Sequence, residues 1–382
     1  MDCSFAGESM PKVKKASKGK SVKKAQVPVP GLKQVADVRK EIISFLSLEE
    51  PQRVAIIADN DPDGFTAAIQ MKKFLDSKGH DSIIFFYDHY ARTSLRFLDL
   101  FVSFAPQKTI FLDLGDSLVS ECLEAVGHYT GPFVSIDHHL AQGIKNAEFP
   151  FSVIKPPVFS AVEPSQYPVS KMIFDLFSGV DWLCSVGLLG DSSEKKWPAV
   201  LRNAEKNHKV SSEELRSLES LIRVVMTQYP DRKQELFVEF YKAEKPQDLF
   251  NSSFFELKKE YDAKLKALEK EYHLKAERVP SIDLVFFEAK HNLSGTLINK
   301  ISRENPSTTL VFYEKPGNFY KSSFRRQDMK VNCREMAELS VKGFKDSGGG
   351  GHVVASGATF PADKLQEFKK RIIEYLEKNY KK

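Results

Sequence analysis

The amino-acid sequence predicts an α/β protein whose larger domain is a doubly wound, mainly parallel sheet. Three short apolar runs rich in Val, Ile and Phe each break off into aspartate and are followed by a helical pattern. Short apolar runs of this kind are typical of buried parallel strands. The runs span residues 53–58, 108–112 and 132–136, and the aspartates that follow them are Asp59, Asp113 and Asp137.

The remaining elements alternate as a doubly wound sheet requires. Residues 35–48 and 65–77 are predicted helices, residues 81–87 a fourth strand, residues 168–189 core helices, and residues 194–245 polar helices. Apolar residues then recur at helical spacing from Leu257 to Tyr272, which predicts a long helix with one buried face. We expect a basic tail (1–30), a first domain (31–245), a connecting helix (246–279) and a smaller α/β domain (280–382).

Ligands of open α/β sheets bind beyond the carboxyl ends of the strands. The three aspartate-bearing strand ends would therefore place several carboxylates in one crevice, together with the imidazoles of His138 and His139. So many anions repel one another unless cations offset their charge. Carboxylate and imidazole ligands suit Mn²⁺ or Mg²⁺, and paired divalent ions are recurring machinery for phosphoester cleavage. The pattern therefore predicts a metal site with more than one ion.

Each aspartate also has a simpler interpretation when taken alone. An aspartate after a strand is commonly a helix N-cap or a turn residue. Asp63-Gly64 could be a turn, Asp116 could cap the helix after it, and Asp191 could cap a polar helical stretch. These alternatives can explain any one aspartate. They explain the aspartates together less well, since two adjacent histidines accompany them.

The motifs together resemble the DHH phosphoesterase superfamily, and within it the archaeal-type RecJ-like nucleases. The resemblance covers residues from about 50 to the end of the chain. It rests on five motifs, which are Asp59-Asn60-Asp61-Pro62-Asp63-Gly64, Asp113 with its neighbours, Asp137-His138-His139, Gly187-Leu188-Leu189-Gly190-Asp191, and Gly348–His352 followed by Ala355-Ser356-Gly357. Other branches of the superfamily carry an acid where this chain has Phe65, which favours the RecJ-like branch.

The resemblance implies two Mn²⁺ or Mg²⁺ ions and a set of site residues. Asp61, Asp63, Asp113, His138 and Asp191 would bind metal directly, with Asp59 and Asp137 at the metal or immediately behind its ligands. His139 would face the scissile phosphate, and Asp137, His138 and His139 would form the catalytic motif. The resemblance further implies a smaller DHH-associated domain that holds substrate.

Two segments near the C-terminus are candidates for phosphate binding. Four successive glycines, Gly348–Gly351, could form a backbone nest for an anion, with His352 beside them. The alternating segment before them would present Ser323 and Arg325 at a strand edge, and both residue types contact phosphate backbones. A linker and a solvated basic strand end are the alternatives. The predicted substrate-binding residues are Ser323, Arg325, Gly349, Gly350, Gly351 and His352.

Charge and composition limit the partners. Residues 1–30 contain seven lysines, Asp2 and Glu8, which accounts for the whole net charge of +5, so residues 31–382 carry no net charge. Such a tail either adds salt-sensitive attraction to nucleic acid or serves solubility alone. The four cysteines are scattered and form no CxxC pair. No apolar run reaches membrane-spanning length, so we expect a cytoplasmic protein without membrane contact.

Three function classes follow from these observations. The leading one is a RecJ-like exonuclease that hydrolyses single-stranded DNA or RNA. The second is an oligoribonuclease or cyclic-dinucleotide phosphodiesterase, which fits the thirty residues that follow His352, too few for a further OB-fold. The third is a replication-complex scaffold that has lost activity, although every expected ligand position is filled. His89, Tyr90 and Arg92, after the fourth strand, could line the crevice or form a simple loop.

Overall fold

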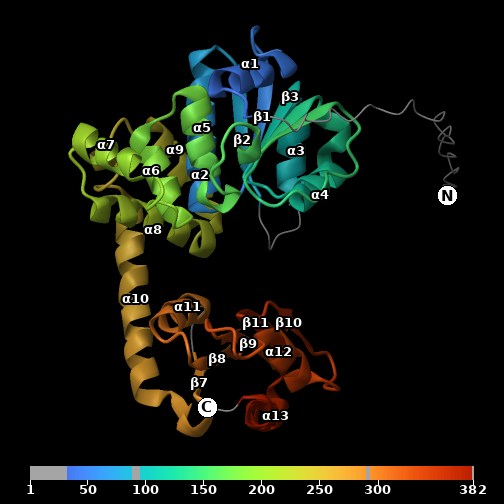
Figure 1. Ribbon diagram of the computed structural model, residues 1–382, viewed down its shortest axis with the longest axis vertical. Helices are drawn as coiled ribbons and strands as arrows, with labels where there is room; N and C mark the ends of the chain where they lie inside the picture. The colour runs from blue at the N-terminus through green and yellow to red at the C-terminus, as the bar shows by residue number, and fades with distance from the viewer. Residues whose placement is uncertain (1–31, 88–94, 290–292, 381–382) are drawn as a thin grey trace, which may run out of the picture. The chain divides into compact units, whose positions relative to one another are not determined.

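The computed structural model describes residues 32–87, 95–289 and 293–380 (Figure 1). The basic tail and the segment with His89, Tyr90 and Arg92 lie outside the described residues. The chain divides into two compact units that meet in the sequence between Phe255 and Glu256. No helix in the described part of the chain combines the length and the apolarity needed to cross a bilayer.

The first unit is built on a five-stranded sheet in which every pairing is parallel. Its order is β2-β1-β3-β4-β5. The strands are β1 (Arg53–Ala58), β2 (Asp81–Phe86), β3 (Lys108–Leu112), β4 (Phe133–Ile136) and β5 (Phe151–Ile154). The predicted doubly wound α/β fold is thus confirmed. Strand β5 was not predicted; it is a four-residue edge strand of which only Ile154 is buried.

Helices cover both faces of this sheet (Figure 1). Alternate residues of β1, Ala55 and Ile57, pack with Phe101 and Val119 from the helices α3 and α4, and α2 and α5 lie on the opposite face. The buried run of β1 reflects this double cover. The helices are α1 (Val35–Phe45), α2 (Pro62–Ser77), α3 (Leu95–Phe104), α4 (Asp116–Val126), α5 (Val169–Phe177), α6 (Asp181–Gly190), α7 (Pro198–His208), α8 (Ser212–Gln228) and α9 (Lys233–Lys242).

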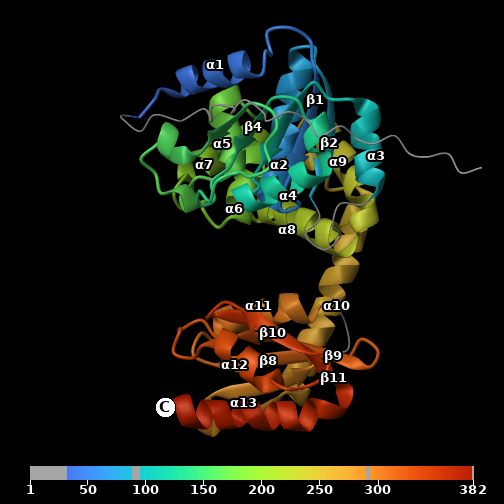
Figure 2. The same cartoon turned by 90° about the vertical axis from the view of Figure 1, so that its right-hand side faces the viewer.

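The second unit has a six-stranded mixed sheet of order β10-β11-β9-β8-β7-β6. Its strands are β6 (Glu277–Val279), β7 (Leu284–Glu288), β8 (Thr309–Glu314), β9 (Phe319–Arg325), β10 (Gly348–Gly351) and β11 (Ala355–Pro361). Its helices are α11 (Ser294–Glu304), α12 (Cys333–Val341) and α13 (Leu365–Asn379). Figure 2 shows α13 on one side of this sheet and α11 on the other.

The long helix α10 (Ser253–Lys275) contributes its apolar stripe to this second core. Tyr272 makes ring contacts with Phe287 of β7 and Phe312 of β8, at centroid distances of 5.5 and 5.4 Å. Leu268 is also buried. The stripe therefore packs in the core, as its helical spacing predicted.

The glycine run does not form the predicted nest. It is the edge strand β10, in which Gly349 pairs with Ala358 and Gly350 with Gly357 of β11. A Cβ atom on Gly349 would lie 2.6 Å from the carbonyl oxygen of Ala337 in α12, so the strand can lie on this helix because it lacks side chains. Gly351 has a φ of +137°, a backbone conformation that other residues rarely adopt.

Candidate metal centre

The first motif follows β1 and forms the start of α2. Asp61 is the N-cap of this helix, and its carboxylate accepts a hydrogen bond of 2.9 Å from the N–H of Gly64. A Cβ atom on Gly64 would lie 2.6 Å from the carbonyl oxygen of Asp59. Glycine therefore lets the backbone fold tightly, so that Asp59, Asp61 and Asp63 all lie at this end of the sheet.

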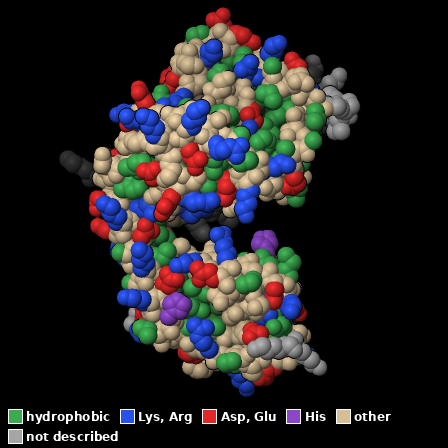
Figure 3. Space-filling model, turned by 60° about the vertical axis from the view of Figure 1, so that its left-hand side comes forward, with side chains coloured by type: hydrophobic (Ala, Val, Ile, Leu, Met, Phe, Trp, Pro, Cys, Tyr) green, Lys and Arg blue, Asp and Glu red, His purple; other side chains and the backbone are tan. Residues whose placement is uncertain are grey.

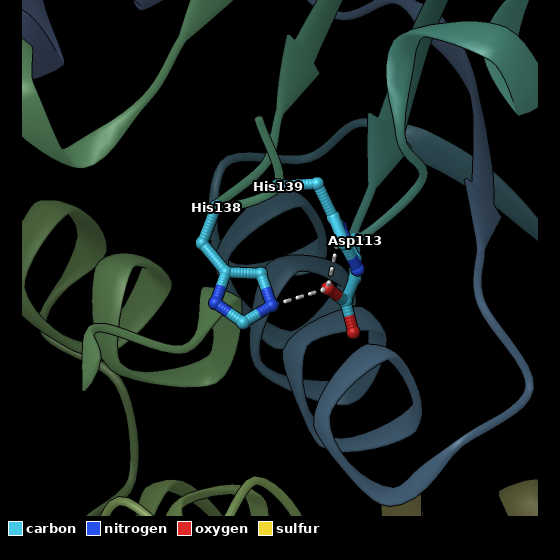
Figure 4. A group of neighbouring side chains, drawn as sticks. All are labelled: Asp113, His138 and His139. Carbon is cyan, nitrogen blue, oxygen red and sulfur yellow. Dashed lines mark ion pairs between the residues drawn. The ribbon is translucent and has the colours of Figure 1, made fainter. Parts of the chain in front are cut away.

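Asp113 follows β3 and is the most constrained member of the cluster. Its backbone has a φ of +60°, which is uncommon for a residue other than glycine and a sign of local strain. Its carboxylate is buried, and Oδ1 makes no hydrogen bond within the described chain. This oxygen lies 3.4 Å from His138 Nε2 and 3.9 Å from His139 Nδ1 (Figure 4). A buried oxygen that faces two imidazoles and lacks a donor among the described residues is a candidate metal ligand.

His138 follows β4 and points its Nε2 atom at two carboxylates. Its Nδ1 lies 3.2 Å from the carbonyl oxygen of Pro164, which accepts a hydrogen bond if this nitrogen is protonated. That tautomer leaves a lone pair on Nε2, which lies 3.4 Å from both Asp113 and Asp191. A carbonyl that fixes the ring in this way is a common support for metal-binding histidines.

Asp63 and Asp191 complete the cluster from the side of α5 and α6. The buried carboxylate of Asp63 accepts hydrogen bonds from the N–H groups of Val169 and Ser170, at 2.6 and 2.9 Å, at the start of α5. Its negative charge is thereby stabilised by a helix N-terminus. Asp191 is the C-cap of α6. The alternative that it caps a following helix is therefore wrong.

Three overlapping sets of side chains could each hold a metal ion, and within each set the ligand atoms all lie within 4.8 Å of one another. The sets are Asp113, His138 and His139; Asp63, His138 and Asp191; and Asp59, Asp61 and Asp113. Their donors are carboxylate oxygens and imidazole nitrogens, which fit Mn²⁺ or Mg²⁺. Because Asp113 and His138 each belong to two sets, the three sets form one continuous cluster of candidate ligands.

The electrostatics of the cluster point the same way. Burial and the neighbouring charges of Asp63 and Asp59 raise the pKa of Asp61 to about 6. Burial and the charges of Asp63 and Asp61 raise the pKa of Asp191 to about 8, and the same causes raise that of Asp113 well above its ordinary value. Carboxylates that resist ionisation in this way are stabilised as anions by a bound cation.

Asp137 lies in the same loop but is not a member of any of the three sets. Its Oδ1 is 2.7 Å from His139 Nδ1, and its Oδ2 accepts a hydrogen bond of 2.5 Å from Lys155 Nζ. Lys155 was not anticipated, because it follows the unpredicted strand β5. Asp116 stands beside it, 3.3 Å from the lysine nitrogen, and accepts hydrogen bonds from the backbone of residues 142 and 143. It does not cap α4 with its side chain.

The second unit has its own open pocket, with a volume of about 460 Å³. Three of the predicted substrate-binding residues line it, namely Ser323, Gly349 and Gly350, together with Ser294, Gly295, Glu314 and Lys321, which the sequence had not singled out. Gly351, Arg325 and His352 are not among its lining residues. The guanidinium of Arg325 instead donates hydrogen bonds to Asn299 Oδ1, at 2.7 Å, and to the carbonyl of Phe324.

Comparison with known protein families identifies both units. The model of the DHH family, N-terminal domain, matches residues 53–178, and that of the DHHA1 domain matches residues 282–378. Together they match more than half of the chain. The chain belongs to the DHH phosphoesterase family. An uncharacterized protein of Methanocaldococcus jannaschii is 32% identical over 96 residues, so the chain matches 22% of the length of this curated relative.

Solved structures show that the DHH protein has a RecJ-like fold. RecJ from Thermus thermophilus in complex with Mn²⁺ aligns with 93% of this chain and 56% of its own, at 14% identity and a TM-score of 0.60. An exonuclease RecJ bound to manganese aligns with 92% of this chain and 96% of its own, at 14% identity and a TM-score of 0.59. CDC45 from Entamoeba histolytica aligns with 91% and 100%, at 9% identity and a TM-score of 0.54.

Proposed function

We propose that this DHH protein is a metal-dependent phosphodiesterase, and specifically a RecJ-like exonuclease that hydrolyses single-stranded DNA or RNA with two Mn²⁺ or Mg²⁺ ions. The observation that carries the proposal is the set of three overlapping ligand groups, which come from the carboxyl ends of β1, β3 and β4, the start of α2 and the end of α6. The likeness in fold to an exonuclease RecJ bound to manganese supports it.

In this proposal Asp59, Asp61, Asp63, Asp113, His138 and Asp191 hold the ions. When bound, such ions lower the pKa of water and stabilise the attacking and leaving oxygens of the phosphoryl group. The protein's part is to fix the ligands and to present His139, whose half-exposed ring lies beside Asp113 and accepts or donates hydrogen bonds at the reacting phosphate. Asp137 orients that ring through its contact with Nδ1.

The pocket of the second unit is the proposed phosphate-binding surface. Ser323 supplies a hydroxyl donor and Lys321 a positive charge, and Gly349 and Gly350 allow close approach to the β10 backbone. Residues 31–382 carry no net charge. On the face drawn in Figure 3, Lys and Arg side chains are interspersed with Asp and Glu. Local contacts of this kind must therefore supply binding.

A cleavage assay tests the proposal. End-labelled single-stranded DNA and RNA should be longer than the roughly 4–16 nucleotides that one binding groove covers, and a dinucleotide should be compared with them in Mn²⁺. Stepwise shortening from one end is expected, and it should be lost in His138→Ala and Asp137→Ala, both of which should remain folded. Turnover confined to the dinucleotide would contradict the exonuclease and favour the small-substrate class.

The likeness to CDC45 favours a second candidate, a scaffold in a replication complex. In a scaffold of this kind, the candidate metal ligands of the chain would no longer support catalysis. The absence of turnover on every substrate, with a folded wild-type chain and bound Mn²⁺, would favour this candidate over the enzyme.

A further inference from the structure

Lys155 lies at the centre of a small network behind the metal centre. It is the first residue after β5, and its side chain is 14% exposed. Its ammonium donates hydrogen bonds to Asp137 Oδ2 at 2.5 Å and to the carbonyl oxygen of His139 at 2.8 Å, and Asp116 Oδ1 lies 3.3 Å away. The lysine thus contacts two buried carboxylates and the backbone of the histidine motif itself.

The two carboxylates fix both ends of the loop that carries the histidines. Asp137 Oδ1 accepts a hydrogen bond of 3.2 Å from the N–H of His139 and contacts its ring nitrogen. Asp116 Oδ2 accepts hydrogen bonds of 2.8 Å from the N–H groups of Gln142 and Gly143. Because Lys155 joins these carboxylates, one side chain restrains the loop at its start, at His139 and at its end.

The network also separates Asp137 from the metal ligands. Both of its oxygens are engaged, one by His139 and the other by Lys155. The other carboxylates of the centre, Asp59, Asp61, Asp63, Asp113 and Asp191, are members of the three ligand sets, and Asp137 is not. The lysine therefore supplies the counter-charge for Asp137 that metal ions supply for the others.

We propose that Lys155 is a positioning residue, which holds Asp137 and the His139 backbone so that the His139 ring faces the reacting phosphate. This inference rests on the proposed function, because the ring is assigned its role there. It makes Lys155 responsible for the geometry of the histidine loop and not for metal binding.

Lys72 provides a matched control for the loss of a half-buried lysine. Its side chain is 20% exposed, and its ammonium contacts Asp76 at 3.1 Å and the carbonyl oxygen of Ser82 at 3.1 Å. It thus makes a carboxylate contact and a carbonyl contact in the same unit, at the opposite part of α2 from the metal centre. If Lys155 only stabilised the fold, its loss and the loss of Lys72 should have similar effects on activity.

The experiment compares Lys155→Met, Lys155→Arg and Lys72→Met in the full chain. Lys155→Met should lower kcat about 10- to 100-fold, as expected for a group that supports a metal site, with KM and Mn²⁺ affinity within about twofold of the wild type. Lys155→Arg keeps the charge and should retain more activity, and Lys72→Met should match the wild type. A Lys155→Met loss no larger than that of Lys72→Met, or accompanied by loss of Mn²⁺ binding, would overturn the proposal.

Histidine-ring NMR separates this proposal from the proposed function. The ring signals of His139, identified by their absence in His139→Gln, should move in Lys155→Met and stay in place in Lys72→Met. If the wild type hydrolyses nothing, the proposed function fails, yet the ring signals still report on Lys155. Unmoved His139 signals in Lys155→Met would contradict the positioning role whether or not the enzyme is active.

Discussion

Asp113 in the first unit and Arg326 in the second are both buried charged side chains, but their surroundings differ. Asp113 has an oxygen without a hydrogen-bond donor among the described residues, and other carboxylates surround it. Arg326 donates two hydrogen bonds to Asp328, at 2.8 and 3.0 Å, and one to Thr309, and its guanidinium lies 4.1 Å from the Tyr380 ring centroid. Among the described residues, Asp113 lacks a compensating positive partner, whereas Arg326 has one in Asp328.

This difference in charge compensation distinguishes a candidate metal site from an ion pair that stabilises the fold. The contact with Arg326 holds the pKa of Asp328 below its ordinary value, whereas burial and like charges raise the pKa of Asp191. An ion pair whose charges compensate each other stabilises the fold. A cluster of like charges without compensation destabilises the metal-free fold, and a bound cation removes this repulsion. Each of the following predictions tests this contrast.

The largest effect is expected at Asp113. Asp113→Asn should lower cleavage about a thousandfold, as the loss of a principal electrostatic group does, and should raise the thermal stability of the metal-free chain. The stability gain follows because one repelling carboxylate is removed. Kinetics and thermal unfolding with and without Mn²⁺ measure both effects. The exposed Asp231→Asn should change neither, and a destabilised, fully active Asp113→Asn would contradict the assignment.

Arg326→Met should act in the opposite way. Removal of one partner leaves Asp328 without its counter-charge and should lower the free energy of unfolding by about 3–5 kcal/mol. Mn²⁺ binding should be unchanged. Denaturant unfolding measures the loss, and Arg334→Met, at a largely exposed ion pair with Glu338, should cost about 0–1 kcal/mol. Equal effects of the two substitutions would show that the buried pair has no special role.

The pH dependence of stability should differ in sign between the units. Asp61 and Asp191 have raised pKa values, of about 6 and about 8, so the unfolded chain releases their protons first. Without divalent ions, the first unit should lose stability as the pH rises from about 4 to about 8. Both tryptophans, Trp182 and Trp197, lie in this unit, so their fluorescence reports its unfolding. Excess Mn²⁺ should remove the loss.

Asp328 should behave in the reverse manner. Its pKa is lowered in the folded chain, so its contribution is present above about pH 4 and is lost as the pH falls through its folded value. Unfolding of the second unit, followed by hydrogen exchange of its own backbone amides, should therefore become less sensitive to acid in Asp328→Asn. A wild type and a variant with the same acid dependence would exclude the ion pair as its source.

The smallest effect is expected at the pocket of the second unit. Lys321→Ala should raise KM for a long single strand up to about tenfold and leave kcat and Mn²⁺ binding unchanged, since one phosphate contact is lost. The salt dependence of binding should also weaken. Lys364→Ala, in the same unit but outside the pocket, should leave KM unchanged. A fall in kcat without a rise in KM would argue against a role in binding.

The strand ends could be predicted because uninterrupted apolar runs that end in aspartate carry a strong signal. Runs 53–58 and 108–112 have the bounds of β1 and β3 in the structure. Lys155 could not be predicted, since β5 is only four residues long and its lysine looks like any residue before a proline. The glycine run was misread because composition alone cannot show that α12 lies against Gly349 and favours an edge strand over a nest. Contacts between distant segments decide such cases.

Titration calorimetry of Mn²⁺ into the metal-free chain tests the central claim most directly. We expect the wild type and Asp328→Asn to bind two ions with similar affinity, and Asp113→Asn to lose at least one of them, because Asp113 belongs to two of the ligand sets. Absence of Mn²⁺ binding to the wild type, or unchanged binding to Asp113→Asn, would contradict the assignment of the uncompensated carboxylates as a metal centre.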